Sequence, residues 1–268
     1  MITTNFHTHT VFCDGKNTPE EMVLAAIEKG FTALGFSGHS YFEPEKDINM
    51  SIDDQKEYIN QIESLKIKYR DKIKIFCGIE QDYYSESPLF SYEYKIGSVH
   101  NILKDGRFLD TDWSAERTKN TVENVYGGDF DSFAEDYFEV VSDVLNKTKA
   151  DIIGHIDLIS KFNEQNGYGE SERYLKAAEK AVKKLIPYGK PFEINTGAMA
   201  RGAKSIPYPS PSILKIIKEN GGKIIFSSDC HDKDFLDFAF DKAVLLAKSV
   251  GFKEHGILTD DGIKYISL

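Results

Sequence analysis

The segment Ile2-Thr3-Thr4-Asn5-Phe6-His7-Thr8-His9 is a short strand-like run that leads directly into a His-x-His pair. Because side chains alternate along an extended chain, His7 and His9 point to the same side, with their Cα atoms about 7 Å apart. Two imidazoles in this arrangement are able to share one metal ion. The segment therefore predicts a metal site at the end of the first strand.

Other apolar runs along the chain also end in residues of metal-ligand type. Near the C-terminus, the run 223–227 leads into Asp229 and His231. Between the two ends of the chain, four more candidates each follow an apolar run: His39, Glu80, His100 and His155. Six of the seven histidines are placed in this way, which predicts a polynuclear metal centre.

Three further residues near these motifs need separate interpretations. Asp14 lies in the turn 12–16 and is a candidate ligand, although Asp-Gly is also a common turn pair. Cys230 alternates away from its two neighbours, so we interpret it as a packing residue. His255 has no strand-like run before it, and we predict that it lies on the surface.

Strand and helix patterns alternate along the chain, which indicates a parallel sheet. Apolar runs predict strands at 2–6, 31–36, 73–79, 94–99, 151–154, 191–195 and 223–227, with a short apolar tail at 263–267. Helical patterns cover 18–30, 53–70, 130–147, 171–186, 211–220 and 235–250. The first helix has an N-cap at Thr18 and a proline at its first position.

Two α/β architectures fit this alternation, an open doubly wound sheet and a barrel. In an open sheet, ligands gather at one switch point, whereas here nearly every strand end contributes a candidate. Convergence from all strands requires that they form a circle. We therefore predict one α/β domain over residues 1–268, a (β/α) barrel with seven main strands and an active site at their C-terminal ends.

Composition excludes several classes of partner. The formal charge of −10 argues against nucleic acid, although a cluster of divalent ions would still make a local cationic pocket for a phosphorylated substrate. No stretch approaches the roughly 18 apolar residues of a membrane span, and we see no signal peptide. The odd, widely spaced cysteines Cys13, Cys77 and Cys230 fit a reducing cytoplasm. The oligomeric state is left open.

The motif set resembles the PHP (polymerase and histidinol phosphatase) superfamily over nearly the whole chain, and within it the histidinol-phosphate phosphatase group. The motifs that carry the resemblance are Phe6-His7-Thr8-His9, Ser37-Gly38-His39, Gly78-Ile79-Glu80, Ser98-Val99-His100, Gly154-His155 and Ser228-Asp229-Cys230-His231. The segments 97–100, 154–162 and 193–196 support the phosphatase group. The resemblance implies a distorted, seven-stranded TIM-like barrel that holds three divalent metal ions.

The resemblance also implies how the ligands are shared. The first ion would be surrounded by His7, His9, Glu80 and Asp229. Glu80 would bridge to a second ion, held together with His100 and His155. The third ion would be bound by Asp14, His39 and His231. Many family members carry histidine in place of Asp14. The third site of this chain therefore has a hard oxygen ligand where those proteins have a softer nitrogen ligand.

A centre of this kind suits hydrolysis of a phosphomonoester. Bridging coordination lowers the pKa of bound water, and the remaining coordination positions stabilise phosphoryl oxygens. We predict Glu80, Asp229 and His231 as catalytic residues, with a role for Asp229 or His231 in protonating the leaving group. We predict that Lys161 and Arg201, in loops after two strands, bind the phosphate, as basic residues in these loops do in histidinol-phosphate phosphatases.

Several functions remain open on the sequence alone. The favoured one is hydrolysis of L-histidinol phosphate in histidine biosynthesis. The alternatives are a phosphatase for a nucleotide, sugar phosphate or phosphotyrosine, an amidohydrolase-type enzyme, and a non-catalytic metal-binding module. Ligands without thiolate admit zinc, iron or manganese. The polar region 101–128, with Trp113, is either an insertion over the active face or a surface excursion.

Overall fold

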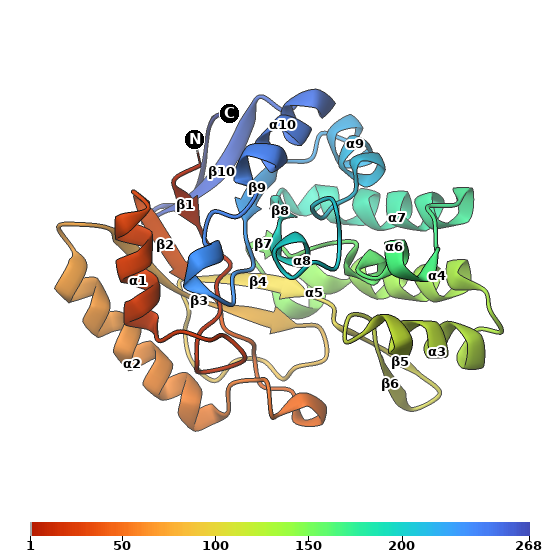
Figure 1. The fold of residues 1–268 in the computed structure, drawn as a ribbon, viewed down its shortest axis with the longest axis horizontal. Helices are drawn as coiled ribbons and strands as arrows, with labels where there is room; N and C mark the ends of the chain where they lie inside the picture. The colour runs from red at the N-terminus through yellow and green to blue at the C-terminus, as the bar shows by residue number, and fades with distance from the viewer. Residues whose placement is uncertain (1) are drawn as a thin grey trace.

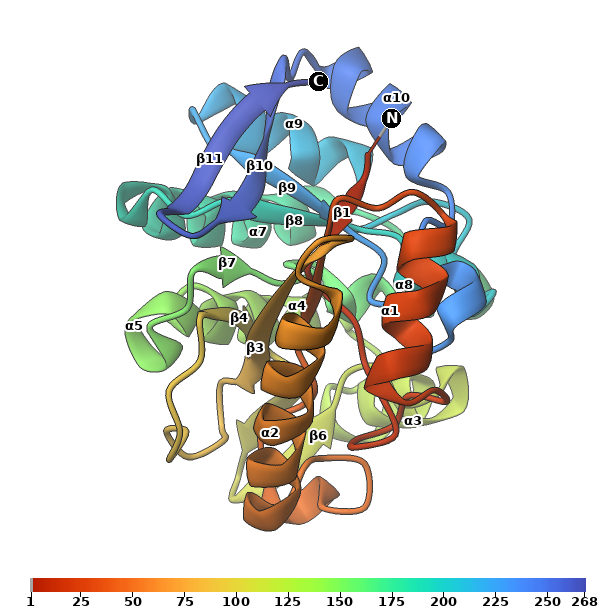
Figure 2. The same cartoon turned by 90° about the vertical axis from the view of Figure 1, so that its left-hand side faces the viewer.

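The computed structural model describes residues 2–268, and its strands form a mostly parallel sheet with helices outside it (Figures 1 and 2). The strands lie in the order β1 (Thr4–Asn5), β2 (Ala33–Phe36), β3 (Lys74–Asp82), β4 (Tyr94–Ser98), β7 (Ile152–Ile153), β8 (Phe192–Asn195), β9 (Ile224–Ser227), β10 (Glu254–Thr259) and β11 (Gly262–Ser267). Neighbours from β1 to β10 pair in parallel, and only β11 is antiparallel, to β10. A separate hairpin consists of β5 (Asn101–Lys104) and β6 (Arg107–Asp110).

The helices follow the strands along the chain. They are α1 (Pro19–Glu28), α2 (Ile52–Tyr69), α3 (Ala115–Val125), α4 (Phe130–Val141), α5 (Val144–Thr148), α6 (Asn163–Asn166), α7 (Glu172–Leu185), α8 (Gly197–Ala200), α9 (Pro211–Glu219) and α10 (Phe240–Val250). The predicted N-cap at Thr18 is present as a capping box with Glu21. No helix within residues 2–268 is both long and apolar enough to cross a membrane.

Both faces of the parallel strands are buried, as expected for strands covered on each side. Alternate strand residues pack against the helices in the larger apolar cluster. The other set forms a smaller cluster on the opposite face, which includes Phe6, Phe76, Tyr94, Ile152 and Ile225. The sheet is therefore held between two apolar layers, which fixes the positions of its strand ends.

The segments that follow β1 and β9 are joined to each other. Thr8 and Cys230 form an isolated parallel bridge. The His9 amide donates to the Cys230 carbonyl oxygen at 2.8 Å, and the Cys230 amide donates to the His7 carbonyl oxygen at 3.2 Å. These bonds bring the first and last predicted ligand motifs together. Cys230 is buried, as its interpretation as a packing residue requires.

Two sequence predictions about secondary structure are wrong. The predicted helix 130–147 is divided into α4 and α5, and the last predicted helix begins only at Phe240, after a 3₁₀ turn at Lys233–Phe235 and a left-handed residue at Ala239. His255 is not a surface residue, since it is only 5% exposed. It lies in β10, between β9 and β11, and its ring packs edge-on against Phe226.

Tyr94 connects the interior of the sheet to two ligand motifs. Its hydroxyl lies 2.6 Å from the carbonyl oxygen of Phe6 and 2.9 Å from that of Phe36. Its ring occupies the space beside Gly78, where an added Cβ would collide with ring carbons.

We expect Gly78→Ala to lower the free energy of unfolding by about 1–3 kcal/mol, measured by urea denaturation. Gly169→Ala is the control, because its Cβ would meet open space; an equal loss in both variants would contradict this packing argument.

Candidate metal centre and active-site pocket

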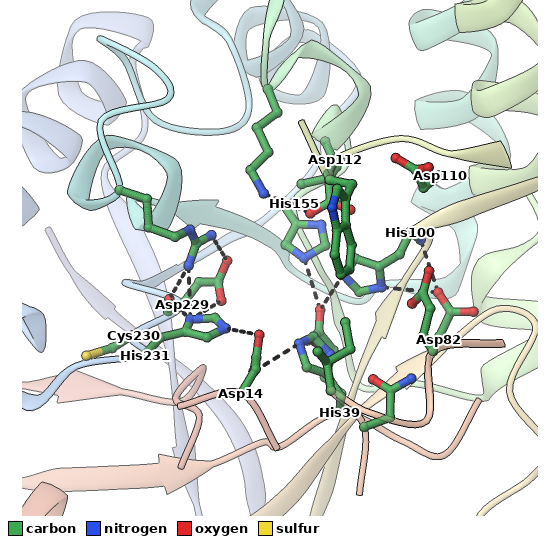
Figure 3. Close-up of a pocket in the computed structure, with 18 of the residues that line it drawn as sticks. Asp14, His39, Asp82, His100, Asp110, Asp112, His155, Asp229, Cys230 and His231 are labelled. Carbon is green, nitrogen blue, oxygen red and sulfur yellow. Dashed lines mark hydrogen bonds and ion pairs between the residues drawn. The ribbon is translucent and has the colours of Figure 1, made fainter. Parts of the chain in front are cut away.

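The nine candidate ligands predicted from the sequence meet in one cluster, at the C-terminal ends of the parallel strands. Their ligand atoms form four overlapping groups, each within 4.8 Å: His9, Asp14, His39 and His231; His7, His155 and Asp229; His7, His9 and Glu80; His39, Glu80 and His100. Seven of the nine, all except His7 and His9, line a pocket of about 610 Å³ (Figure 3).

Glu80 occupies the middle of this cluster and is 1% exposed. Its Oε2 atom lies 3.2 Å from His7 Nε2, 3.5 Å from His9 Nε2 and 3.0 Å from His39 Nδ1. Its Oε1 atom faces a different pair, His155 Nε2 at 3.0 Å and His100 Nε2 at 3.5 Å. The two oxygens of one carboxylate therefore serve two sets of imidazoles, which is the geometry that a bridging ligand requires.

Asp14 reaches the cluster because the turn that carries it is hydrogen-bonded to the segment after β9. The Lys16 amide donates to the His231 carbonyl oxygen at 2.8 Å, which anchors the turn. Asp14 Oδ2 lies 3.1 Å from His231 Nε2, and its Oδ1 lies 3.6 Å from His39 Nε2. Asp14 thus lies between two imidazoles.

The donor set fits a bound cation. His7 Nε2, His9 Nε2 and Glu80 Oε2 are buried atoms without a hydrogen-bond partner among the described residues. Burying such groups unpaired is costly, and a cation that accepts their lone pairs removes the cost. Burial, followed by the nearby His231 and His39, lowers the pKa of His9 to about 3, so its imidazole is in the neutral form that binds metals. Burial alone would raise the pKa of Glu80, but the positive charge of protonated His7, His39 and His100 holds it well below its usual range, and a bound cation would act in the same direction.

Two carboxylates that the sequence reasoning missed orient the imidazoles. Glu193 Oε1 accepts from His7 Nδ1 at 2.6 Å, and its Oε2 accepts from the His155 amide at 2.9 Å. Asp82 Oδ2 lies 3.2 Å from His100 Nδ1 and also accepts from the His100 amide. A carboxylate that holds one ring nitrogen as a donor leaves the other nitrogen free to bind metal.

We expect Glu193→Gln to weaken metal binding by roughly 10- to 100-fold, because an amide holds the His7 ring less firmly in the required tautomer. The measurement is a competition titration of the loaded protein with a chelator. Glu45→Gln is a matched control, since Glu45 lines the same pocket but bonds to Asn101 at 2.8 Å. Unchanged affinity in Glu193→Gln would mean that His7 does not depend on this carboxylate.

Arg201 lies against the cluster. Its Nη2 donates to Asp229 Oδ2 at 2.9 Å, and its Nη1 lies 2.9 Å from His231 Nδ1. Asp229 has a φ of 47°, in the left-handed region that non-glycine residues rarely adopt. Such conformations are found at functional sites, where surrounding contacts maintain them. Arg201 therefore contacts two candidate ligands, Asp229 and His231, and also lines the pocket.

Lys161 also lines the pocket, next to a 3₁₀ turn at Leu158–Ser160. Its ammonium donates to Asp112 Oδ2 at 2.9 Å. Asp112 belongs to the region 101–128, together with the pocket residues Asp110 and Trp113. Of the two interpretations of that region, the structure favours an insertion that forms part of the active face.

A comparison with protein families identifies the fold that carries this site. A model of the PHP domain matches residues 5–197. The chain belongs to the PHP domain family. The family resemblance inferred from the strand-end motifs is therefore confirmed.

Two relatives of this PHP protein are both named as histidinol-phosphatases. The probable histidinol-phosphatase of Schizosaccharomyces pombe is 28% identical over 252 residues, which cover 84% of this chain and 79% of that protein. The histidinol-phosphatase of Bacillus subtilis is 26% identical over 258 residues, which cover 88% of this chain and 96% of that protein.

A solved structure shows the same fold. The histidinol phosphate phosphatase of Lactococcus lactis, in complex with zinc, L-histidinol and phosphate, matches with a TM-score of 0.73 and 22% identity. The match covers 98% of each chain.

Proposed function

We propose that this PHP protein hydrolyses L-histidinol phosphate to L-histidinol and phosphate, a step of histidine biosynthesis. The observation that carries the proposal is the composition of the pocket, where a cluster of metal-ligand side chains faces the cations Lys161 and Arg201. The names of the relatives from Schizosaccharomyces pombe and Bacillus subtilis specify the substrate.

The proposed ligands are the nine clustered residues, and the proposed cofactors are three divalent ions. Zinc is the first choice, since it is present in the related Lactococcus structure. Bound divalent ions would activate a water molecule and neutralise the developing charge on the phosphoryl oxygens. Glu80 would be shared between ions through its two oxygens, as their separate neighbours suggest.

The remaining roles belong to groups on the pocket wall. Lys161 and Arg201 would hold the phosphate oxygens, the first as a point charge and the second through its planar fork. Asp229 or His231 would take up the proton that the activated water loses and pass it to the leaving alkoxide. Arg201 fixes both of these side chains and so would keep the proton donor in position.

The proposal includes the finer features of the fold. We propose a single domain over residues 1–268, in which the sheet forms a distorted barrel with seven main strands from β1 to β9. The bridge between Thr8 and Cys230 supports closure between the first and last of these strands. We also propose a cytoplasmic location and a small-molecule substrate, without nucleic acid or membrane partners.

A panel of phosphomonoesters tests the proposed activity. Zinc-loaded protein is supplied with L-histidinol phosphate, a nucleotide, a sugar phosphate and a phosphotyrosine peptide, and phosphate release is measured. We expect the highest kcat/KM for L-histidinol phosphate. A higher kcat/KM for any other member of the panel would contradict the proposed substrate and would indicate a PHP-type phosphatase that acts on that other ester.

A further inference from the structure

The insertion after β4 supplies a wall of the pocket that the metal cluster does not occupy. The hairpin β5–β6 and the loop after it bring Asp110, Asp112 and Trp113 to this wall. Asp112 lines the same pocket as His100 and His155, and Figure 3 shows it on their side of the pocket. Trp113 is 54% exposed and adds an aromatic surface. The organic part of a substrate held at the cluster would therefore lie near this wall.

Asp112 is paired with one of the two proposed phosphate cations. Its Oδ2 accepts from Lys161 Nζ at 2.9 Å, and the two side chains are only 26% and 12% exposed. A phosphate that binds Lys161 competes with Asp112 for the same ammonium donors. The carboxylate would then lack its partner in a largely buried position, which is unfavourable unless another cation replaces it.

We propose that Asp112 determines specificity by accepting the ammonium group of the substrate, so that the pocket selects phosphomonoesters with an amine close to the ester. The inference rests on the proposed function. In L-histidinol phosphate, a two-carbon bridge separates the ester oxygen from the amine, so the amine needs an acceptor beside a phosphate donor. Asp112 is placed in this way next to Lys161. Binding exchanges one ion pair for two and leaves no charge unpaired.

Besides Asp112, and Asp232, which pairs with Lys16 at 3.2 Å, three more carboxylates outside the ligand cluster line the pocket, and each has a different environment. Glu45 bonds to the Asn101 amide at 2.8 Å. Asp82 is engaged with His100 and with the Tyr84 amide. Asp110 Oδ2 lies 3.4 Å from Arg117 Nη1, but the buried Oδ1 atom has no hydrogen-bond partner within residues 2–268. Asp110 is thus the rival acceptor and is included in the test.

The test compares substrates with and without the amine. Zinc-loaded wild type and Asp112→Asn are assayed with L-histidinol phosphate and its deamino analogue, and with 2-aminoethyl phosphate and ethyl phosphate. We expect the wild type to prefer the amine member of each pair by roughly 10- to 200-fold in kcat/KM, the scale of a charge-assisted hydrogen bond. Asp112→Asn removes this preference, because kcat/KM falls only for the amine substrates. Inhibition by inorganic phosphate becomes stronger, since Lys161 is released.

Control variants separate this role from a structural one. Glu45→Gln and Asp110→Asn each remove one charge from the same wall, and we expect both to retain the amine preference. An equal loss on both members of a pair in Asp112→Asn would overturn the inference, as would loss of the preference in Asp110→Asn. A wild type that releases phosphate but ignores the amine would also overturn it and leave phosphatase activity standing. A wild type that hydrolyses none of the four esters would instead defeat the proposed function.

Discussion

Glu80→Gln is expected to lower kcat/KM for L-histidinol phosphate by roughly 10³-fold, the scale of losing one group that organises charge in the transition state. The substitution nearly preserves shape but removes the negative charge at the centre of the cluster. In the wild type, the two carboxylate oxygens of Glu80 each lie within 3.5 Å of a different set of imidazole nitrogens. The variant should therefore lose metal from both of the proposed sites that share Glu80. Metal analysis of the purified variant measures this loss directly.

The fold of Glu80→Gln should survive, because the strand that carries Glu80 is held by pairing on both sides. Circular dichroism and a urea titration of the metal-free proteins check this point. Glu45→Gln makes the same chemical change on the pocket wall and should retain metal. Near-normal turnover of Glu80→Gln would show that the carboxylate does not bridge ions.

The second large effect is expected from the two phosphate cations. A charge-assisted hydrogen bond contributes about 1.5–3 kcal/mol, so Lys161→Ala and Arg201→Ala should each reduce kcat/KM by roughly 10- to 200-fold. Lys161→Ala should leave the metal content unchanged. Arg201→Ala should also disturb Asp229, which Arg201 holds at 2.9 Å. Steady-state kinetics and metal analysis of the same preparations separate these contributions.

Further variants distinguish a phosphate contact from a general charge effect. Arg201→Lys should restore only part of the activity, because one ammonium does not reproduce a bidentate fork. Lys16→Ala is the control, since Lys16 lines the pocket but pairs with Asp232 and is largely exposed. Inhibition by inorganic phosphate should weaken together with substrate turnover. Wild-type kcat/KM and wild-type phosphate inhibition in both alanine variants would place the phosphate contacts elsewhere.

The convergence of the candidate ligands could be predicted because it depends on local patterns. His7 and His9 follow from strand alternation, and Glu80 and His155 each follow a short buried run. Parallel strands in repeated strand–helix units direct their C-terminal ends to one side. Eight such residues after strands, together with Asp14 in the turn 12–16, were therefore sufficient to locate the pocket.

The orienting carboxylates were missed because their function depends on neighbours in space. Asp82 lies two residues after Glu80, and Glu193 lies two residues before Asn195. In a strand, each carboxylate therefore points to the same face as another polar residue. Nothing local indicates that Glu193 meets His7, which lies 186 residues away along the chain. Alternation from a known ligand is the signal that would have identified Asp82.

His255 and the helix break have similar explanations. His255 follows no apolar run. Its burial results from the pairing of β10 with β9, which precedes it in the chain, and with β11, which follows it. The helical pattern 130–147 continues through Ser142 and Asp143, but the Ser142 hydroxyl donates to the Glu139 carbonyl oxygen and Asp143 accepts from Tyr83. The local bond from the Ser142 hydroxyl to the backbone competes with helix continuation.

The most direct test of the central claim is a zinc titration of metal-free protein, with bound metal and phosphate release from L-histidinol phosphate measured on the same samples. Nine clustered ligand residues, one of them a shared carboxylate, predict that activity reaches its plateau when about three ions are bound per chain. Full activity with a single bound ion, or no phosphate release from the fully loaded protein, would contradict the account.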